Sequence, residues 1–130
     1  MRILIAEDDL ASRKFLFEVL SSHGTCDLTV DGIEALDAFL LAWDEGRPYE
    51  LVCLDIMMPK VDGIKALKTI RDIEKQKGIA DSDRVKVIMT TALTNTNSVY
   101  EAYSIGCEAY AAKPIDVEKL AEVLRKLKLI

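Results

Sequence analysis

The stretch LVCLDIMMPKVDG, residues 51–63, joins an apolar run to an acid and then to a loop that contains a proline. Residues 51–54 are apolar in succession, which is typical of a strand buried on both faces of a parallel sheet. Asp55 follows at once, where a carboxylate contributes nothing to a hydrophobic core. Asp55 is therefore either an ordinary loop residue or the group that this strand presents.

Similar short apolar runs recur along the chain, and a helical pattern follows each of them. The expected strands cover residues 3–6, 26–30, 50–54, 85–89 and 108–112, and the expected helices cover 10–22, 31–46, 63–77, a short segment ending at 106, and 116–127. Strict alternation of strand and helix predicts a parallel sheet with helices on both faces. The first, third and fourth runs read as central strands, whereas the second alternates as an edge strand does. We therefore predict a doubly wound α/β domain with strand order 2-1-3-4-5.

Length and composition indicate one domain over residues 1–130, and the net charge of −5 argues against a basic nucleic-acid surface. The longest apolar runs fall short of the roughly 18 residues that a membrane span requires. The residues after Met1 show no signal-peptide pattern. Cys26, Cys53 and Cys107 lack the spacing of a metal site, so we expect free thiols in a reducing cytoplasm.

Polar residues follow four of the expected strands at their carboxyl ends, where sheets of this order bind ligands. They are Glu7, Asp8 and Asp9 after the first strand, Asp55 after the third, Thr90 and Thr91 after the fourth, and Lys113 after the fifth. Two like charges about 4 Å apart cost about 4 kcal/mol at an effective dielectric near 20, so three carboxylates here require a cation unless their pKa values rise sharply. Mg²⁺ suits carboxylate and carbonyl oxygens. The set predicts phosphorylation of a carboxylate, with Thr91 and Lys113 holding phosphoryl oxygens.

At this point the chain resembles the receiver domains of two-component response regulators, and in particular single-domain chemotaxis regulators. The motifs that carry the resemblance are ILIAEDD at 3–9, DGIEAL at 31–36, LDIMMPKVDG at 54–63, MTTA at 89–92 and GCEAYAAKP at 106–114. The resemblance implies a flavodoxin-like (βα)5 three-layer sandwich. It also implies Mg²⁺-dependent transfer of a phosphoryl group from a histidine kinase or a histidine phosphotransfer protein.

The resemblance also implies a role for each residue of the acidic cluster. Asp55 is the expected phosphoacceptor and a metal ligand, Asp8 the expected direct Mg²⁺ ligand, and Glu7 a ligand acting through water. Met57 is expected to bind Mg²⁺ through its backbone carbonyl, whatever its side chain. Asp9 falls one place beyond the acid pair and is expected near the N-cap of the first helix.

The remaining implied roles concern the response to phosphorylation. Thr91 is the expected switch hydroxyl, Lys113 the lysine that contacts phosphate, and the bond from Lys113 to Pro114 is expected to be cis. Tyr110 occupies the place of the switch aromatic. Met57 and Leu93 occupy positions that tune loss of the phosphoryl group, and because both are bulky and apolar we hypothesise a slowly decaying phosphorylated form.

The expected function is thus a signalling switch that catalyses its own phosphorylation and dephosphorylation and acts through protein contact. The expected surface for a downstream protein or a second copy of the chain consists of the helix ending at Gly106, strand 108–112 and the last helix.

Two alternative functions remain open. An aspartyl-phosphate phosphatase or small phosphotransferase would usually carry a second acid where Met57 lies. A receiver-like module that never takes phosphate would not need the full polar set. A nucleotide site would require a glycine-rich motif that the sequence lacks.

Overall fold

The computed structural model describes residues 1–92 and 96–130, so Leu93 and its expected role in phosphoryl loss lie outside the described residues. Within those two ranges, five strands alternate with five α-helices, and one short 3-10 turn lies at Asp81–Asp83. The elements are β1 Arg2–Ala6, α1 Leu10–Leu20, β2 Thr25–Thr29, α2 Gly32–Asp44, β3 Leu51–Asp55, α3 Gly63–Gln76, β4 Lys86–Ala92, α4 Thr96–Ile105, β5 Ala109–Lys113 and α5 Val117–Lys126.

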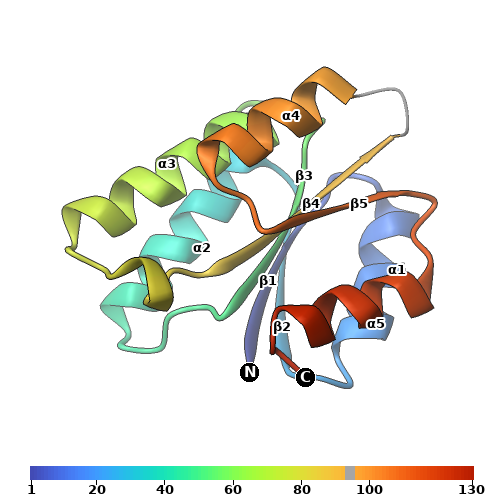
Figure 1. The fold of residues 1–130 in the computed structure, drawn as a ribbon, viewed down its shortest axis with the longest axis horizontal. Helices are drawn as coiled ribbons and strands as arrows, with labels where there is room; N and C mark the ends of the chain where they lie inside the picture. The colour runs from blue at the N-terminus through green and yellow to red at the C-terminus, as the bar shows by residue number, and fades with distance from the viewer. Residues whose placement is uncertain (93–95) are drawn as a thin grey trace.

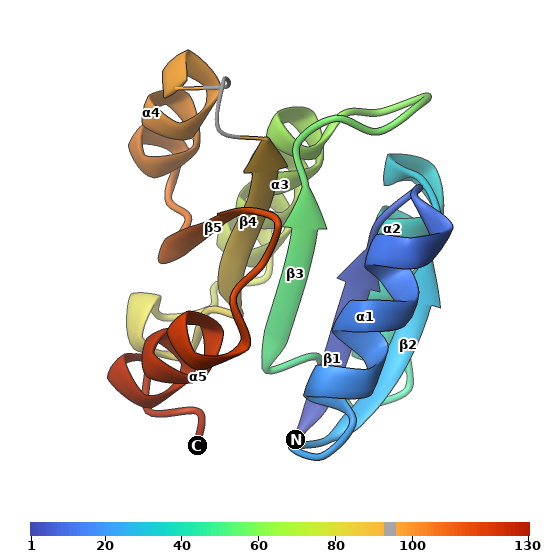
Figure 2. The same cartoon turned by 90° about the vertical axis from the view of Figure 1, so that its right-hand side faces the viewer.

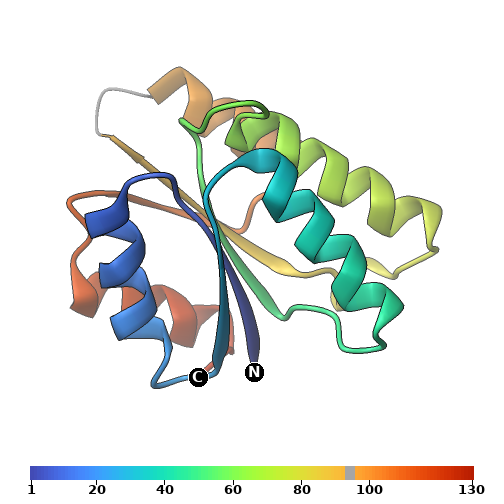
Figure 3. The ribbon, with the colours of Figure 1, turned by 180° about the vertical axis from the view of Figure 1, so that it is seen from behind.

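The strands form one parallel sheet in the order β2-β1-β3-β4-β5. Helices α2, α3 and α4 cover one face and α1 and α5 the other, as Figure 1 shows and as Figure 3 shows from behind. These three layers confirm the predicted doubly wound fold. The central strands β1 and β3 alternate between the two layers, so that Leu4 and Val52 belong to the core under α2 and α3, whereas Ile3 and Cys53 belong to the core under α1 and α5. Double burial explains why these strands are apolar throughout.

The carboxyl ends of the strands lie at one edge of the sheet, where the arrows point in Figure 2. Ala6 of β1 pairs with Leu54 of β3, so Glu7 and Asp55 each stand one residue further along neighbouring strands. Asp55 pairs with Thr90 of β4, and Lys113 pairs with Ala92 of the same strand. The sheet therefore gathers residues from four separate parts of the sequence at this edge.

All strands except β4 match the sequence prediction to within one residue at their ends, and β2 differs from it in a further respect. β4 continues three residues beyond the expected end at 89, so Thr90 and Thr91 lie within the strand and are buried. In the edge strand β2, Thr29 is buried and Leu28 is 45% exposed, the reverse of what polarity suggests. Thr29 is accommodated because its hydroxyl donates to the carbonyl of Ile5 at 3.0 Å.

A buried ionic network holds the opposite edge of the sheet together. Arg71 of α3 is only 8% exposed and contacts Glu74 at 2.7 Å and Glu108 at 2.9 Å. Its guanidinium also donates to the carbonyls of Val85 and Gly106 at 2.9 and 2.8 Å. Arg71 thereby links α3 to the start of β4 and to the turn that leads into β5.

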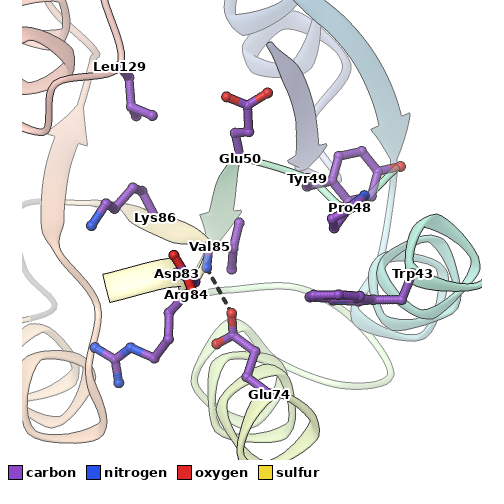
Figure 4. Close-up of a pocket in the computed structure, with 10 residues that line it drawn as sticks. All are labelled: Trp43, Pro48, Tyr49, Glu50, Glu74, Asp83, Arg84, Val85, Lys86 and Leu129. Carbon is purple, nitrogen blue, oxygen red and sulfur yellow. Dashed lines mark hydrogen bonds between the residues drawn. The ribbon is translucent and has the colours of Figure 1, made fainter. Parts of the chain in front are cut away.

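The carboxylates of this network also accept backbone hydrogen bonds from β4. Glu74 accepts from the N–H of Val85 at 2.8 Å, the dashed line in Figure 4, and Glu108 accepts from the N–H of Val87 at 2.6 Å. Figure 4 looks into a pocket of about 260 Å³ beside this network, with Trp43 and Pro48 among its walls. Each charge in the network has a partner, as burial of charge requires.

We predict that Arg71→Met lowers the free energy of unfolding by about 3–5 kcal/mol, because Glu74 would remain buried without its cation and Glu108 would keep only Arg84, 3.8 Å away. Urea denaturation measures this change. Lys68→Met on the exposed side of the same helix is the control, with an expected change within about 0.5 kcal/mol. Equal losses for the two variants would show that the network contributes nothing beyond a surface residue.

Candidate functional site at the carboxyl edge of the sheet

Three carboxylates meet where β1 and β3 end. Glu7, Asp8 and Asp55 each offer an oxygen, and these oxygens all lie within 4.8 Å of one another. Glu7 is 0% exposed and Asp55 3% exposed, whereas Asp8 is open to solvent. The cluster therefore has two buried carboxylates and one exposed carboxylate, and a hydrated cation can enter from the exposed side.

The backbone around Glu7 is held from several directions. Its N–H donates to the carbonyl of Thr29 at 3.1 Å, and the Arg13 guanidinium donates to its carbonyl at 2.9 Å. Asp9 accepts a hydrogen bond from the N–H of Ser12 at 2.9 Å and is the N-cap of α1, which confirms the capping role expected for it. Capping explains the third acid of the EDD run and leaves Glu7 and Asp8 for the cluster.

Lys113 brings the balancing positive charge from the end of β5. Its Nζ lies 2.5 Å from Oε1 of Glu7 and 3.3 Å from Oδ2 of Asp55. The peptide bond from Lys113 to Pro114 is cis, as expected from the family resemblance. One ammonium thus bridges two buried carboxylates that belong to different strands.

The pKa values of the two buried carboxylates are shifted in opposite directions. Burial and the neighbouring Glu7 raise the pKa of Asp55 from 3.8 to about 8, although Lys113 acts in the opposite direction. Burial also acts to raise the pKa of Glu7, but the hydrogen bond from Asp55 and the Lys113 ammonium together lower it. Glu7 is therefore the charged member and Asp55 the protonated one when no cation is bound.

The other expected site residues lie near this cluster with different partners. The N–H of Met57 donates to Oδ1 of Asp55 at 3.3 Å, and the Met57 side chain is 64% exposed. Thr91 is buried on β4, with its hydroxyl donating to the carbonyl of Ala92 at 3.2 Å. Tyr110 is 45% exposed on β5 and packs edge-on against Tyr103, with ring centroids 6.1 Å apart. Glu7, Asp8, Asp55 and Lys113 are thus brought together, whereas Tyr110 lies outward.

One contact beside the cluster was not anticipated from the sequence. Lys60, in the loop after Asp55, forms an ion pair with Asp31 at the start of α2, at 3.4 Å. Aspartate–glycine pairs at 31–32 and 62–63 mark the starts of α2 and α3, but no local sequence pattern indicates that Lys60 pairs with Asp31.

Comparison with known proteins gives a consistent result. The family model described as the response regulator receiver domain matches residues 3–125. Chemotaxis protein CheY of Treponema pallidum is 32% identical over 130 residues, covering 95% of this chain and 83% of that protein. Response regulator MprA of Mycobacterium avium is 34% identical over 128 residues, covering 98% of this chain. The chain spans 50% of the length of that MprA.

Solved structures agree in fold. The CheX–CheY–BeF3–Mg complex from Borrelia burgdorferi includes a chain with a TM-score of 0.82 and 28% identity, matched over 98% of this chain and 89% of that one. The complex of the Saccharomyces cerevisiae phosphotransfer protein Ypd1 with the receiver domain of Ssk1 includes a chain with a TM-score of 0.81 and 28% identity, matched over 100% of this chain and 92% of that one.

Within residues 1–92 and 96–130, every helix is too short or too polar to cross a membrane.

We predict that, without metal, stability falls as the pH rises from about 4 to about 8 because of Asp55. Its pKa is higher in the folded protein than the ordinary 3.8, so its contribution is full below pH 4 and is lost as the proton leaves near pH 8. Asp55→Asn should therefore exceed the wild type in stability by at least about 1 kcal/mol at pH 9 in EDTA, and by much less at pH 4. Urea denaturation at both pH values measures this, and parallel curves for the two proteins would contradict it.

Proposed function

The chain belongs to the response regulator receiver domain family of two-component systems, and we propose that Asp55 is the residue that accepts its phosphoryl group. The observation that carries the proposal is the meeting of Glu7, Asp8 and Asp55 with Lys113 at one edge of the sheet. Asp55 is the last residue of β3, and the rigid buried strand behind it fixes its position. A nucleophile so placed requires little reorganisation.

We propose Mg²⁺ as the cofactor, held by Asp8 and Asp55, by Glu7 through water, and by the carbonyl of Met57. The cluster fits this ion because its oxygens converge within 4.8 Å and Asp8 leaves it open to water. Bound Mg²⁺ supplies positive charge that neutralises the acceptor and the incoming phosphoryl oxygens. The CheY chain in the Borrelia burgdorferi complex is described with Mg and BeF3, which supports the same assignment here.

The chain's own residues then perform the transfer. Asp55 must lose its proton to solvent, and its Oδ forms a bond to phosphorus as the donor leaves phosphorus with the electron pair of the broken bond. We propose that Lys113, whose Nζ lies 3.3 Å from Asp55, holds a phosphoryl oxygen after the transfer. Thr91 lies on the strand next to β3, and we propose that its hydroxyl turns from the carbonyl of Ala92 to the phosphoryl group.

The output surface is proposed to be α4, β5 and α5. Tyr100, Tyr103 and Tyr110 expose large apolar rings there, between 45% and 74% accessible. A pocket of about 450 Å³ lies between β5 and α5, with Tyr110 in its wall. We propose that Tyr110 turns inward after Thr91 moves, so that a downstream protein or a second copy of the chain meets a changed surface.

A histidine kinase or a histidine phosphotransfer protein is the proposed donor. The Ypd1–Ssk1 complex supports this, because a phosphotransfer protein is bound to a receiver domain in it. The proposed compartment is the cytoplasm, in keeping with three cysteines that are free thiols.

We predict that incubation with acetyl phosphate adds the mass of one phosphoryl group only when Mg²⁺ is present. Intact mass spectrometry measures this. Asp55→Ala should add nothing, and Asp37→Ala, which removes an exposed aspartate of α2, should behave as the wild type. Addition without Mg²⁺, or equal addition to Asp55→Ala, would contradict the proposed function.

A further inference from the structure

The loop between β3 and α3, residues 56–62, is closed at its base by backbone contacts. The N–H of Ile56 donates to the carbonyl of Thr90 at 3.0 Å, and the N–H of Gly63 donates to the carbonyl of Ile56 at 2.9 Å. A side chain at Gly63 would meet the carbonyl oxygen of Asp55 at 2.1 Å, so only glycine allows this closure. The base of the loop is thus fixed to the sheet beside Asp55.

The far part of the loop rests on the start of α2, and Figure 2 shows it reaching toward that helix. A Cβ added to Gly32 would lie 2.0 Å from the carbonyl oxygen of Val61, so the two backbones are in direct contact. Val61 also packs against the core under α2 and α3. Met57, by contrast, is 64% exposed, and its N–H donates to Oδ1 of Asp55 at 3.3 Å.

Lys60 forms the remaining connection between the loop and α2. Its backbone has φ +68°, a left-handed conformation that non-glycine residues seldom adopt. Its Nζ lies 3.4 Å from Oδ2 of Asp31. Asp31 is only 4% exposed, and its other oxygen caps α2 by accepting from the N–H of Glu34 at 2.9 Å. A buried carboxylate that also caps a helix has a fixed position, and it therefore anchors the lysine.

We propose that the Lys60–Asp31 ion pair is a positioning device that holds residues 57–60 so that the carbonyl of Met57 faces the metal site. The inference rests on the proposed function, because it assumes that Mg²⁺ binds beside Asp55. Lys60 acts here through the backbone of its loop and does not touch the ion.

If Lys60 acts only through its charge, its removal should change Mg²⁺ affinity in one direction; if it positions the loop, its removal should change that affinity in the other. Removing a positive charge near a cation site strengthens Mg²⁺ binding if electrostatics alone matters. Removing the anchor of the loop weakens Mg²⁺ binding if Lys60 positions a ligand, and second-sphere changes of this kind typically cost tenfold or more in affinity. The sign of the change therefore separates the two roles.

The test uses Lys60→Met, which keeps the length of the side chain and removes its charge. The Mg²⁺ dependence of the melting temperature gives the apparent Kd. We expect Lys60→Met to raise that Kd about tenfold. We also expect the metal-free melting temperature to stay within about 4 °C of the wild type, because Lys60 is exposed. The Mg²⁺ concentration that gives half-maximal phosphorylation by acetyl phosphate should rise by the same factor.

Two further variants complete the design. Asp31→Asn keeps the cap of α2 but removes the anchor charge, and combining it with Lys60→Met should weaken binding no further than either change alone. Lys65→Met, an exposed lysine in the first turn of α3, is the matched control and should not weaken Mg²⁺ binding. Mg²⁺ binding by Lys60→Met that equals or exceeds the wild type would overturn the inference while leaving the proposed function intact. A wild type that Mg²⁺ does not stabilise would overturn both.

Discussion

The repulsion between the carboxylates of Glu7 and Asp55 is the physical constraint on which the rest of this structure depends. Both side chains are buried, and burial together with the neighbouring Glu7 carboxylate raises the pKa of Asp55 to about 8. A proton, the Lys113 ammonium and a divalent cation are alternative ways of balancing the same charge. Under the proposed function, a bound metal ion would take the place of the proton and leave Asp55 ionised, as a nucleophile must be.

The topology of the sheet is what allows Lys113 to take part. β1 and β3 are neighbours, but β5 is two strands from β3. β4 continues two residues beyond its pairing with Asp55, and Lys113 pairs with the last of these, Ala92. The end of β5 is thus carried past Asp55, and the long lysine side chain reaches back to it. The backbone near the cluster is closely packed, with Gly63 against the carbonyl of Asp55 and Gly32 against the carbonyl of Val61.

Local patterns in the sequence were sufficient for the elements, their order and the acidic cluster. The cap at Asp9, the apolar strands and the lysine before Pro114 each have a signature within a few residues. The end of β4 was predicted too early, because the hydroxyls of Thr90 and Thr91 suggested a turn, whereas pairing with β3 and β5 keeps them in the strand.

Contacts between charged residues far apart in the chain could not be predicted in the same way. Arg71 and Glu74 have the spacing of an ordinary exposed helix pair, and only the packing of α3 on β4 buries them with Glu108. The pairing of Lys60 with Asp31 likewise depends on how a loop crosses a helix end. Such partners are set by tertiary structure, and either residue alone is unremarkable in sequence.

The measurement that tests the central claim most directly is the location of the phosphoryl group in the chain. Treating the acetyl phosphate product with sodium borohydride reduces an aspartyl phosphate to homoserine, which peptide mass spectrometry can place. The account predicts homoserine at position 55, in the peptide that contains residues 51–63, and only after phosphorylation with Mg²⁺. Homoserine at Asp8 or Asp9, with Asp55 unchanged, would contradict it.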